Sequence, residues 1–183
     1  MIILAKSLRL KNIKGTERMS RLLLVGDLHL GHNNIHRYRT YFKSAEEHHE
    51  VLFDNLATMV RKRDTIYFMG DVAFTQEWLD KIKGLRCLHK LLILGNHDTD
   101  KKLQVKDYVP VYDKIVSLMS KRNYWFSHCP IHPDEMRRKI GNIHGHTHDY
   151  VVQDPRYINV CPEHTDWKPI TFEDAIKNDA FGR

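Results

Sequence analysis

The chain contains 183 residues, of which 29 are Lys or Arg and 23 are Asp or Glu, so its formal net charge at neutral pH is +6. Hydrophobic residues make up 42% and charged residues 28% of the sequence, a balance that is typical of globular proteins and excludes a disordered or membrane-embedded class. This length suits one domain that buries a core without disulfides or a structural metal.

The start of the chain and its cysteines indicate a cytoplasmic protein without a membrane partner. The first apolar run ends at Ala5 and is too short for a spanning helix or a signal peptide. The cysteines are odd in number and lack C-x-x-C spacing, which favours reduced thiols over a disulfide framework. We expect Cys129 and Cys161 to be small buried residues.

Residues 1–18 are ambiguous, because Met19 lies directly before the first strong strand signal and would itself be a sensible start. The leader could form an extra N-terminal strand or a tail. Residues 19–183 contain no internal repeat, low-complexity tract or linker. We therefore expect them to form a single domain.

Four short apolar runs each end in a polar cluster, and each predicts a buried strand. The runs span residues 22–25, 66–69, 91–94 and 124–126. Because these runs are almost continuously hydrophobic, both faces of the predicted sheet should be covered, by helices or by a second sheet.

Two helices are predicted between these strands. Ser44 opens a capping-box pattern, and apolar residues follow at helical spacing, which predicts a helix from about Ser44 to Arg63. A second helix should start after Thr75 and stop at Gly84. This alternation of strands and helices is typical of an α/β fold.

The C-terminal half is predicted to be rich in β-structure. Short strands are expected near residues 140–143, 150–152 and 157–160, and they are separated by Asp-Pro and Cys-Pro turns.

Polar residues follow the predicted strands one after another, and ligands gather outside the carboxyl ends of the strands in an open α/β sheet. The clusters are D-x-H, G-D, G-N-H-D, S-H and G-H-T-H, beginning respectively at Asp27, Gly70, Gly95, Ser127 and Gly145. Their nitrogen and oxygen donors suit two divalent cations, with Mn²⁺, Fe, Zn²⁺ and Ni²⁺ as candidates.

These ordered clusters resemble the calcineurin-like metallophosphoesterase superfamily, whose pattern is D-x-H, G-D, G-N-H-[DE], a lone His and G-H-x-H. The match runs from Asp27 to His148, about two-thirds of the chain. Residues 27–35 further resemble small bacterial and phage phosphoesterases. The resemblance implies two packed mixed β-sheets flanked by helices, in a four-layer α/β/β/α sandwich, and a metal-dependent phosphoric ester hydrolase.

Carried over by position, the resemblance implies ligands for two metals. It assigns one metal to Asp27, His29 and His148, and the other to Asn96, His128 and His146. Asp71 would be the carboxylate that bridges both metals. Such a metal pair lowers the pKa of a shared water, so that hydroxide is available near neutral pH to attack phosphorus in line.

By the same resemblance, His97 lies near the leaving group and is the candidate general acid, and it would contact substrate together with Asn96. His32 could touch the substrate phosphate or be a hydrogen-bonded loop histidine. Phe74 stands where many superfamily phosphatases have an Asp that orients the catalytic His. No Arg follows the G-N-H-D segment, which argues against a protein Ser/Thr phosphatase.

The expected activity is hydrolysis of a small phosphodiester or phosphomonoester, with a nucleotide among the candidates. Two alternatives are a metal-binding scaffold without hydrolysis and a nuclease. A nucleic acid partner is less favoured, because 183 residues leave little room for an appended binding domain. Arg39 could cradle phosphate, but surface solubility is the preferred interpretation.

Overall fold

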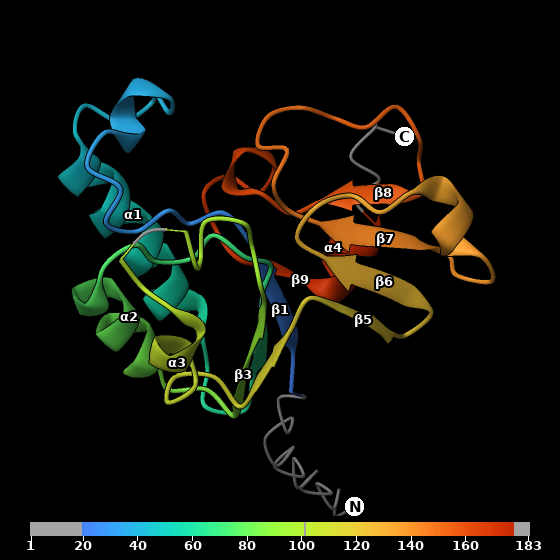
Figure 1. Cartoon of the computed structure of the whole chain (residues 1–183), viewed down its shortest axis with the longest axis horizontal. Coiled ribbons are helices and arrows are strands. Elements are labelled where there is room, and N and C mark those ends of the chain that lie inside the picture. Colours follow the sequence, from blue (N-terminus) through green and yellow to red (C-terminus); the bar gives the residue numbers. More distant parts are fainter. Residues whose placement is uncertain (1–19, 101, 178–183) are drawn as a thin grey trace, which may run out of the picture.

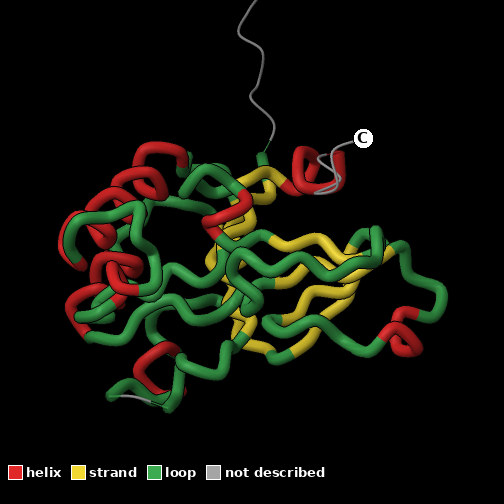
Figure 2. The backbone as a smooth tube through the Cα atoms, turned by 90° about the horizontal axis from the view of Figure 1, so that it is seen from above, coloured by secondary structure: helices red, strands yellow, loops and turns green. Residues whose placement is uncertain are grey.

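The structure is a computed structural model that describes residues 20–100 and 102–177. Two β-sheets lie against each other, and most helices lie on the far side of one sheet (Figures 1 and 2). The predicted α/β fold with two packed mixed sheets and flanking helices is confirmed. The expectation for residues 1–18 lies outside the described residues.

The first sheet has the strand order β4-β3-β2-β1-β9 and is parallel except for β9. In that order its strands are Lys114–Val116, His89–Ile93, Thr65–Phe68, Leu22–Val25 and Ile170–Thr171. The second sheet has the order β5-β6-β7-β8, and only the β5–β6 pairing is antiparallel. Its strands are Leu118–Lys121, Tyr124–Ser127, Gly141–His144 and Tyr157–Asn159.

The described helices are short apart from the first. The α-helices α1 to α4 span Ala45–Met59, Gln76–Lys83, Val105–Tyr108 and Phe172–Lys177, and the 3-10 helices η1 to η3 span Ile35–Arg37, Pro133–Met136 and Pro162–His164. The Ser44 hydroxyl accepts a hydrogen bond from the Glu47 N–H at 3.1 Å, so Ser44 caps α1 as predicted. Helix α1 ends before Arg63 because Val60 is extended and Asp64 accepts the N–H of Arg61.

Strand β1 carries side chains of two separate cores because successive residues of a strand point to opposite faces. Leu23 and Val25 pack with residues of α1 and α2, and Leu22 and Leu24 pack with residues of the second sheet. All four are buried, as the continuous hydrophobic run predicts. The first sheet is therefore the middle layer of the molecule.

Several sequence predictions of strands need correction. Residues 150–152 form no strand, because Tyr150 follows a turn in which its N–H donates to the Thr147 carbonyl, and its side chain is exposed. Strands β4, β5 and β9 were not predicted, since they are short and mostly not buried. Among the described residues, no helix is long and apolar enough to cross a membrane.

Candidate metal centre

Five of the strands deliver the candidate ligands, each from just beyond its carboxyl end. β1, β2 and β3 of the first sheet are followed by Asp27, Asp71 and Asn96, and β6 and β7 of the second sheet are followed by His128 and His146. The two sheets thus meet at one edge where both contribute polar side chains. The edge was predicted from the sequence, but the division between two sheets was implied by the resemblance alone.

The backbone at this edge is strained. Asp27, His29, Asp71, His146 and His148 all have positive φ values between 48° and 70°. Such a conformation costs a non-glycine residue of order 1–3 kcal/mol and tends to cluster at functional sites. The left-handed backbone turns these side chains back toward one another.

Two glycines leave the space that the carboxylates occupy. A Cβ at Gly95 would lie 2.2 Å from Oδ1 of Asp71, and a Cβ at Gly145 would lie 2.2 Å from Oδ2 of Asp27. The same Asp27 oxygen accepts the backbone N–H of His146 at 2.9 Å. The glycines of the motifs are therefore required by close approach of the ligands.

The side chains at this edge fall into overlapping groups. The ligand atoms of Asp27, His29 and His148 lie within 4.8 Å of one another, and so do those of Asp27, Asp71 and His128. Oδ2 of Asp71 lies 3.8 Å from Nε2 of His29 and 3.4 Å from Nε2 of His128. Asp71 therefore stands between the two halves of the site, where the resemblance implies a bridging carboxylate.

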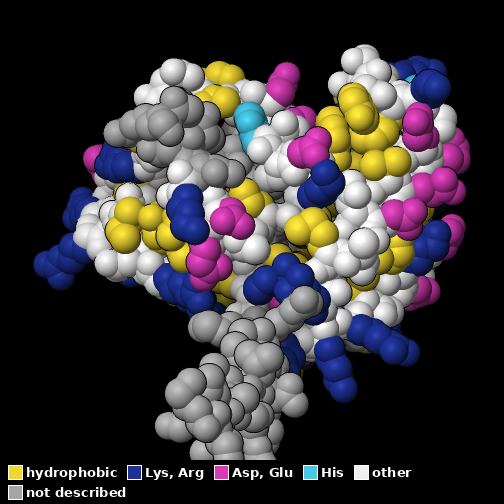
Figure 3. Space-filling view, turned by 180° about the vertical axis from the view of Figure 1, so that it is seen from behind, with side chains coloured by type: hydrophobic (Ala, Val, Ile, Leu, Met, Phe, Trp, Pro, Cys, Tyr) yellow, Lys and Arg dark blue, Asp and Glu magenta, His cyan; other side chains and the backbone are white. Residues whose placement is uncertain are grey.

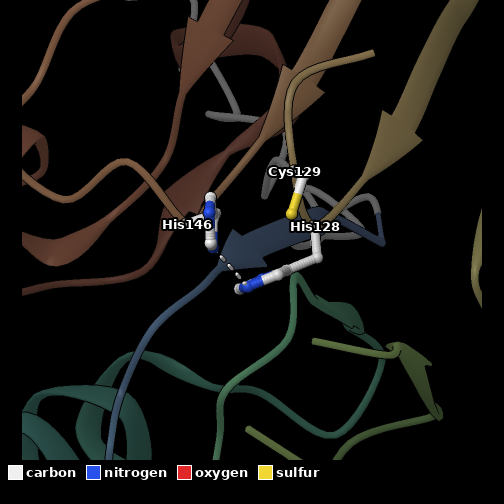
Figure 4. Close-up of side chains that lie close together, drawn as sticks. All are labelled: His128, Cys129 and His146. Carbon is white, nitrogen blue, oxygen red and sulfur yellow. Dashed lines mark hydrogen bonds between the residues drawn. The ribbon is translucent and has the colours of Figure 1, made fainter. Parts of the chain in front are cut away.

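The second half of the site is built around His128 (Figure 4). Its Nε2 lies 2.9 Å from Oδ1 of Asn96 and 3.2 Å from Nδ1 of His146. Its Nδ1–H donates to the Met69 carbonyl at 2.7 Å, which leaves the Nε2 lone pair for a cation. The structure thus brings together all seven residues that were predicted as ligands.

The unpaired atoms of the site fit a bound cation. Oδ1 of Asp27 and both ring nitrogens of His29 are buried without a hydrogen-bond partner. A buried polar group without a partner costs about 1–3 kcal/mol. A divalent cation would satisfy Oδ1 of Asp27 and one ring nitrogen of His29, and this mixed nitrogen and oxygen chemistry suits Mn²⁺, Fe or Zn²⁺.

Asp71 and His128 shift each other's pKa values. Burial favours a higher pKa for Asp71, but the hydrogen bond and the positive charge of His128 outweigh it and hold the pKa below its usual value. Burial lowers the pKa of His128, yet Asp71 and Asp27 raise it overall to about 9. A cation held at Nε2 of His128 would displace a proton from that nitrogen.

Arg39 and Glu163 support the site through hydrogen bonds. The Arg39 guanidinium donates from Nε to Oε1 of Glu163 at 2.8 Å and from an Nη to the Asp27 carbonyl at 2.7 Å. Oε1 of Glu163 lies 3.1 Å from Nδ1 of His148, so it can hold that ring with Nε2 available to a metal. Arg39 is 5% exposed, and its interpretation as a solubilising surface residue was wrong. No local pattern signals a pair 124 residues apart.

Asp98, the last residue of the G-N-H-D segment, was not assigned a role from the sequence. Its carboxylate accepts backbone N–H groups of Asp71, Val72 and Gly95 at 2.8–3.0 Å. Burial raises the pKa of Asp98 to about 6, despite those hydrogen bonds. Asp98 therefore ties the turn after β2 to the turn after β3.

Cys161 and Cys129 differ in their exposure to solvent. Cys161 is buried, as predicted, and its Sγ–H donates to Oδ2 of Asp27 at 3.2 Å. Cys129 is exposed rather than buried, because it follows β6 at the open edge of the site. Its sulfur and the ring nitrogens of His128 and His146 lie within 4.8 Å of one another (Figure 4).

His97 is held by a partner that the sequence did not suggest. Its Nδ1 lies 2.7 Å from Oδ2 of Asp100, and its backbone N–H donates to Oδ1 of Asp71 at 2.8 Å. Phe74 is buried, and its ring centroid lies 5.9 Å from that of His97. The carboxylate that contacts His97 thus belongs to Asp100, whereas position 74 holds the aromatic ring of Phe74.

A cavity of about 680 Å³ opens beside the ligands and is lined by His29, His148, His97 and His32 together with aromatic side chains. His32 also accepts the Asn34 N–H at its Nδ1. His32 is thus hydrogen-bonded within its loop and also lines the cavity, and its contact with a substrate phosphate stays a prediction.

A family model for calcineurin-like phosphoesterases matches residues 20–177. The chain belongs to this family. Membership supports a metal-dependent phosphoester hydrolase at the general level, in agreement with the resemblance noted from the motifs.

Three similar proteins extend this comparison. An uncharacterised protein of Methanocaldococcus jannaschii is 29% identical over 174 residues, which cover 87% of this chain and 91% of the relative. The gene 66 protein of Mycobacterium phage L5 is 28% identical over 170 residues, with coverages of 73% and 80%. The crystal structure of a protein of unknown function from Aquifex aeolicus covers 87% of this chain and 99% of its own, with 24% identity and a TM-score of 0.68. That structure shares the fold.

Proposed function

We propose that the chain hydrolyses a small phosphate ester with two divalent metal ions. The observation that carries this proposal is the convergence of nitrogen and oxygen donors at one sheet edge, with buried donor atoms of Asp27 and His29 left unpaired. Asp27, His29 and His148 would hold one ion. The other would be held by Asn96, His128 and His146, with Asp71 shared between the two. Bound metals would lower the pKa of water and neutralise phosphate charge.

The protein's own groups would position these ligands and handle the leaving group. Arg39 and Glu163 hold His148, and Asp98 holds the backbone of Asp71. We assign to His97 the proton donation to the leaving-group oxygen. Asp100 engages Nδ1 of His97, so Nε2 is the nitrogen that would donate. Asn96 and His32 would complete the contacts with the phosphate.

A small substrate fits better than a nucleic acid polymer. The cavity volume of about 680 Å³ falls in the range of small-molecule sites. On the face drawn in Figure 3, Lys and Arg side chains are interspersed with Asp and Glu side chains, whereas polymer binding relies on a continuous basic surface. We therefore favour a phosphodiester or phosphomonoester of low molecular mass.

The test is hydrolysis of bis-p-nitrophenyl phosphate and p-nitrophenyl phosphate by protein stripped of metal and resupplied with Mn²⁺, Ni²⁺ or Zn²⁺. We expect metal to restore activity, and the preference between the esters to separate a diesterase from a monoesterase. Asp71→Asn should abolish activity while the protein remains folded by circular dichroism. Full activity in this variant would refute the proposed site. A metal-binding scaffold would bind the ions and hydrolyse neither ester.

A further inference from the structure

The cavity beside the candidate metal centre has an aromatic wall that faces solvent. Tyr38 and Tyr41 line it and are 78% and 73% exposed, and Trp167 lines it beside them. Large aromatic side chains usually bury most of their surface. Two exposed tyrosines on one cavity therefore indicate a surface that is kept open for a ligand.

Part of this wall is already assembled as a stack. The rings of Tyr41 and Trp167 lie 5.5 Å apart between centroids at an interplanar angle of 24°, and Phe42 packs edge-on against Trp167 at 4.8 Å. The backbone N–H of Trp167 donates to the Pro162 carbonyl, and the Asn55 side chain donates to the Trp167 carbonyl. The Trp167 part of the wall is thus held in place before any ligand arrives, which reduces the entropic cost of binding.

Backbone strain occurs at the same place. Asp166 and Trp167 both have positive φ values, 52° and 60°. A bulky residue in the left-handed region is a true outlier and tends to mark a functional position. Trp167 lines the cavity from this strained turn.

The same cavity carries the groups that would take a phosphate. His29, His148 and His97 line it together with the aromatic wall, and the rings of His32 and Tyr38 lie 6.0 Å apart between centroids. A ligand that contacts both parts of this lining would combine a phosphate with a planar apolar group. Nucleobases stack on aromatic side chains whatever their sequence, because every base has a π-face.

We propose that this wall is a binding subsite for the nucleobase of a nucleotide, with the phosphate of the same molecule at the metal centre. The assignment rests on the proposed function for the position of the phosphate. It goes further by naming the organic part of the substrate and the residues that select it, Tyr38 and Tyr41, with Trp167 stacked against Tyr41.

The test compares inhibition by AMP and by ribose 5-phosphate, which share the sugar phosphate and differ in the base. Inhibition constants are measured at initial rates against bis-p-nitrophenyl phosphate in the presence of Mn²⁺. The wild-type protein should bind AMP about 5- to 150-fold more tightly, from the usual contribution of one stacked base. The double variant Tyr38→Leu/Tyr41→Leu should bring this ratio close to one.

Matched controls separate stacking from general damage. The variant Tyr38→Phe/Tyr41→Phe keeps both rings and should keep the ratio. Tyr150 is also an exposed tyrosine but does not line the cavity, so Tyr150→Leu should leave the ratio unchanged. An equal affinity for both ligands in the wild type, or a ratio that survives the double Leu variant, overturns the proposal.

A second measurement separates failure of the proposed function from failure of the proposed subsite. If no metal restores hydrolysis, the proposed function fails, and equilibrium dialysis of labelled AMP and ribose 5-phosphate with Mn²⁺ still tests the subsite. A preference for AMP that is lost in the double Leu variant supports the subsite without catalysis. No preference in dialysis overturns it.

Discussion

At the scale of single residues, the partner of His97 is the least expected feature of the site. Many superfamily phosphatases have an Asp where this chain has Phe74, and the motif alone left His97 without an orienting group. Asp100 lies 2.7 Å from its Nδ1. The sequence could not identify this pair, because Asp100 belongs to a loop whose path no periodic pattern determines.

If Asp100 positions His97 for proton donation, its loss should matter most when the leaving group needs a proton. We expect Asp100→Asn to lower kcat for phenyl phosphate about 10- to 100-fold, with a smaller loss for p-nitrophenyl phosphate and little change in KM. Steady-state kinetics on both esters check this. Asp54 is an exposed residue on α1, and Asp54→Asn is the control. Equal losses on both esters would indicate a structural role instead.

The motif glycines predict a second test at the residue scale. In Gly145→Ala the new methyl group would meet Oδ2 of Asp27 at 2.2 Å. We expect a loss of about 1–3 kcal/mol in the free energy of unfolding and weaker Mn²⁺ binding, measured by urea denaturation and calorimetry. Gly84→Ala is the control, because its nearest contact is 3.4 Å. Mn²⁺ binding at the wild-type level in Gly145→Ala would contradict the inference that Asp27 needs the space beside Gly145.

At the scale of elements, the predicted strands and helices were those with strong local signals. Strands β1, β2, β3 and β6 were predicted because each contains a short apolar run, and α1 because Ser44 begins a capping pattern. Strands β4 and β9 have few residues and owe their structure to pairing with neighbours in the sheet. Residues 150–152 show the reverse, since their β-branched valines were read as a strand although no neighbour pairs with them.

The caps of α1 and α2 provide a matched pair for measuring element stability. The Ser44 side chain accepts a hydrogen bond from Glu47, whereas Thr75 caps α2 without a side-chain hydrogen bond. Ser44→Ala should therefore lower the free energy of unfolding by about 1 kcal/mol, and Thr75→Ala by clearly less. Urea denaturation measures both. Equal effects would show that the hydroxyl of Ser44 contributes nothing as a cap.

The junction between the starts of β1 and β2 should be sensitive to acid. Asp64 is buried, and although burial raises its pKa, hydrogen bonds from Arg21 and Arg61 hold the pKa below its usual value of 3.8. A depressed folded-state pKa contributes stability that is present above the unfolded-state pKa and is lost as pH falls below it. Asp64→Asn should flatten the decline in stability below about pH 4, as measured by urea denaturation across pH.

At the scale of the whole molecule, the candidate ligands join two sheets that also pack together through a shared apolar core. Asp27 and Asp71 follow strands of the first sheet, and His128 and His146 follow strands of the second. The order of the motifs predicted that these groups converge. The cross-sheet supports could not be foreseen, since Arg39 and Glu163 are brought together only by the complete fold.

Metal should therefore stabilise the entire fold. Ligands that bind only the folded state raise its stability by mass action, and here the ions would link both sheets. Adding Mn²⁺ to metal-free protein should raise Tm, and chelation should reverse the change. In Asp71→Asn the increase should be much smaller. An identical Tm with and without Mn²⁺, measured by calorimetry, would contradict metal binding at this edge.

The wide spacing of the ligands along the chain also has a consequence for biosynthesis. Asp27 and His148 lie within one ligand group, yet about two-thirds of the chain is synthesised between them. Glu163, which holds His148, follows later still. The complete set of candidate ligands therefore forms only after the second sheet has docked on the first, so the proposed metal pair would be acquired late in folding.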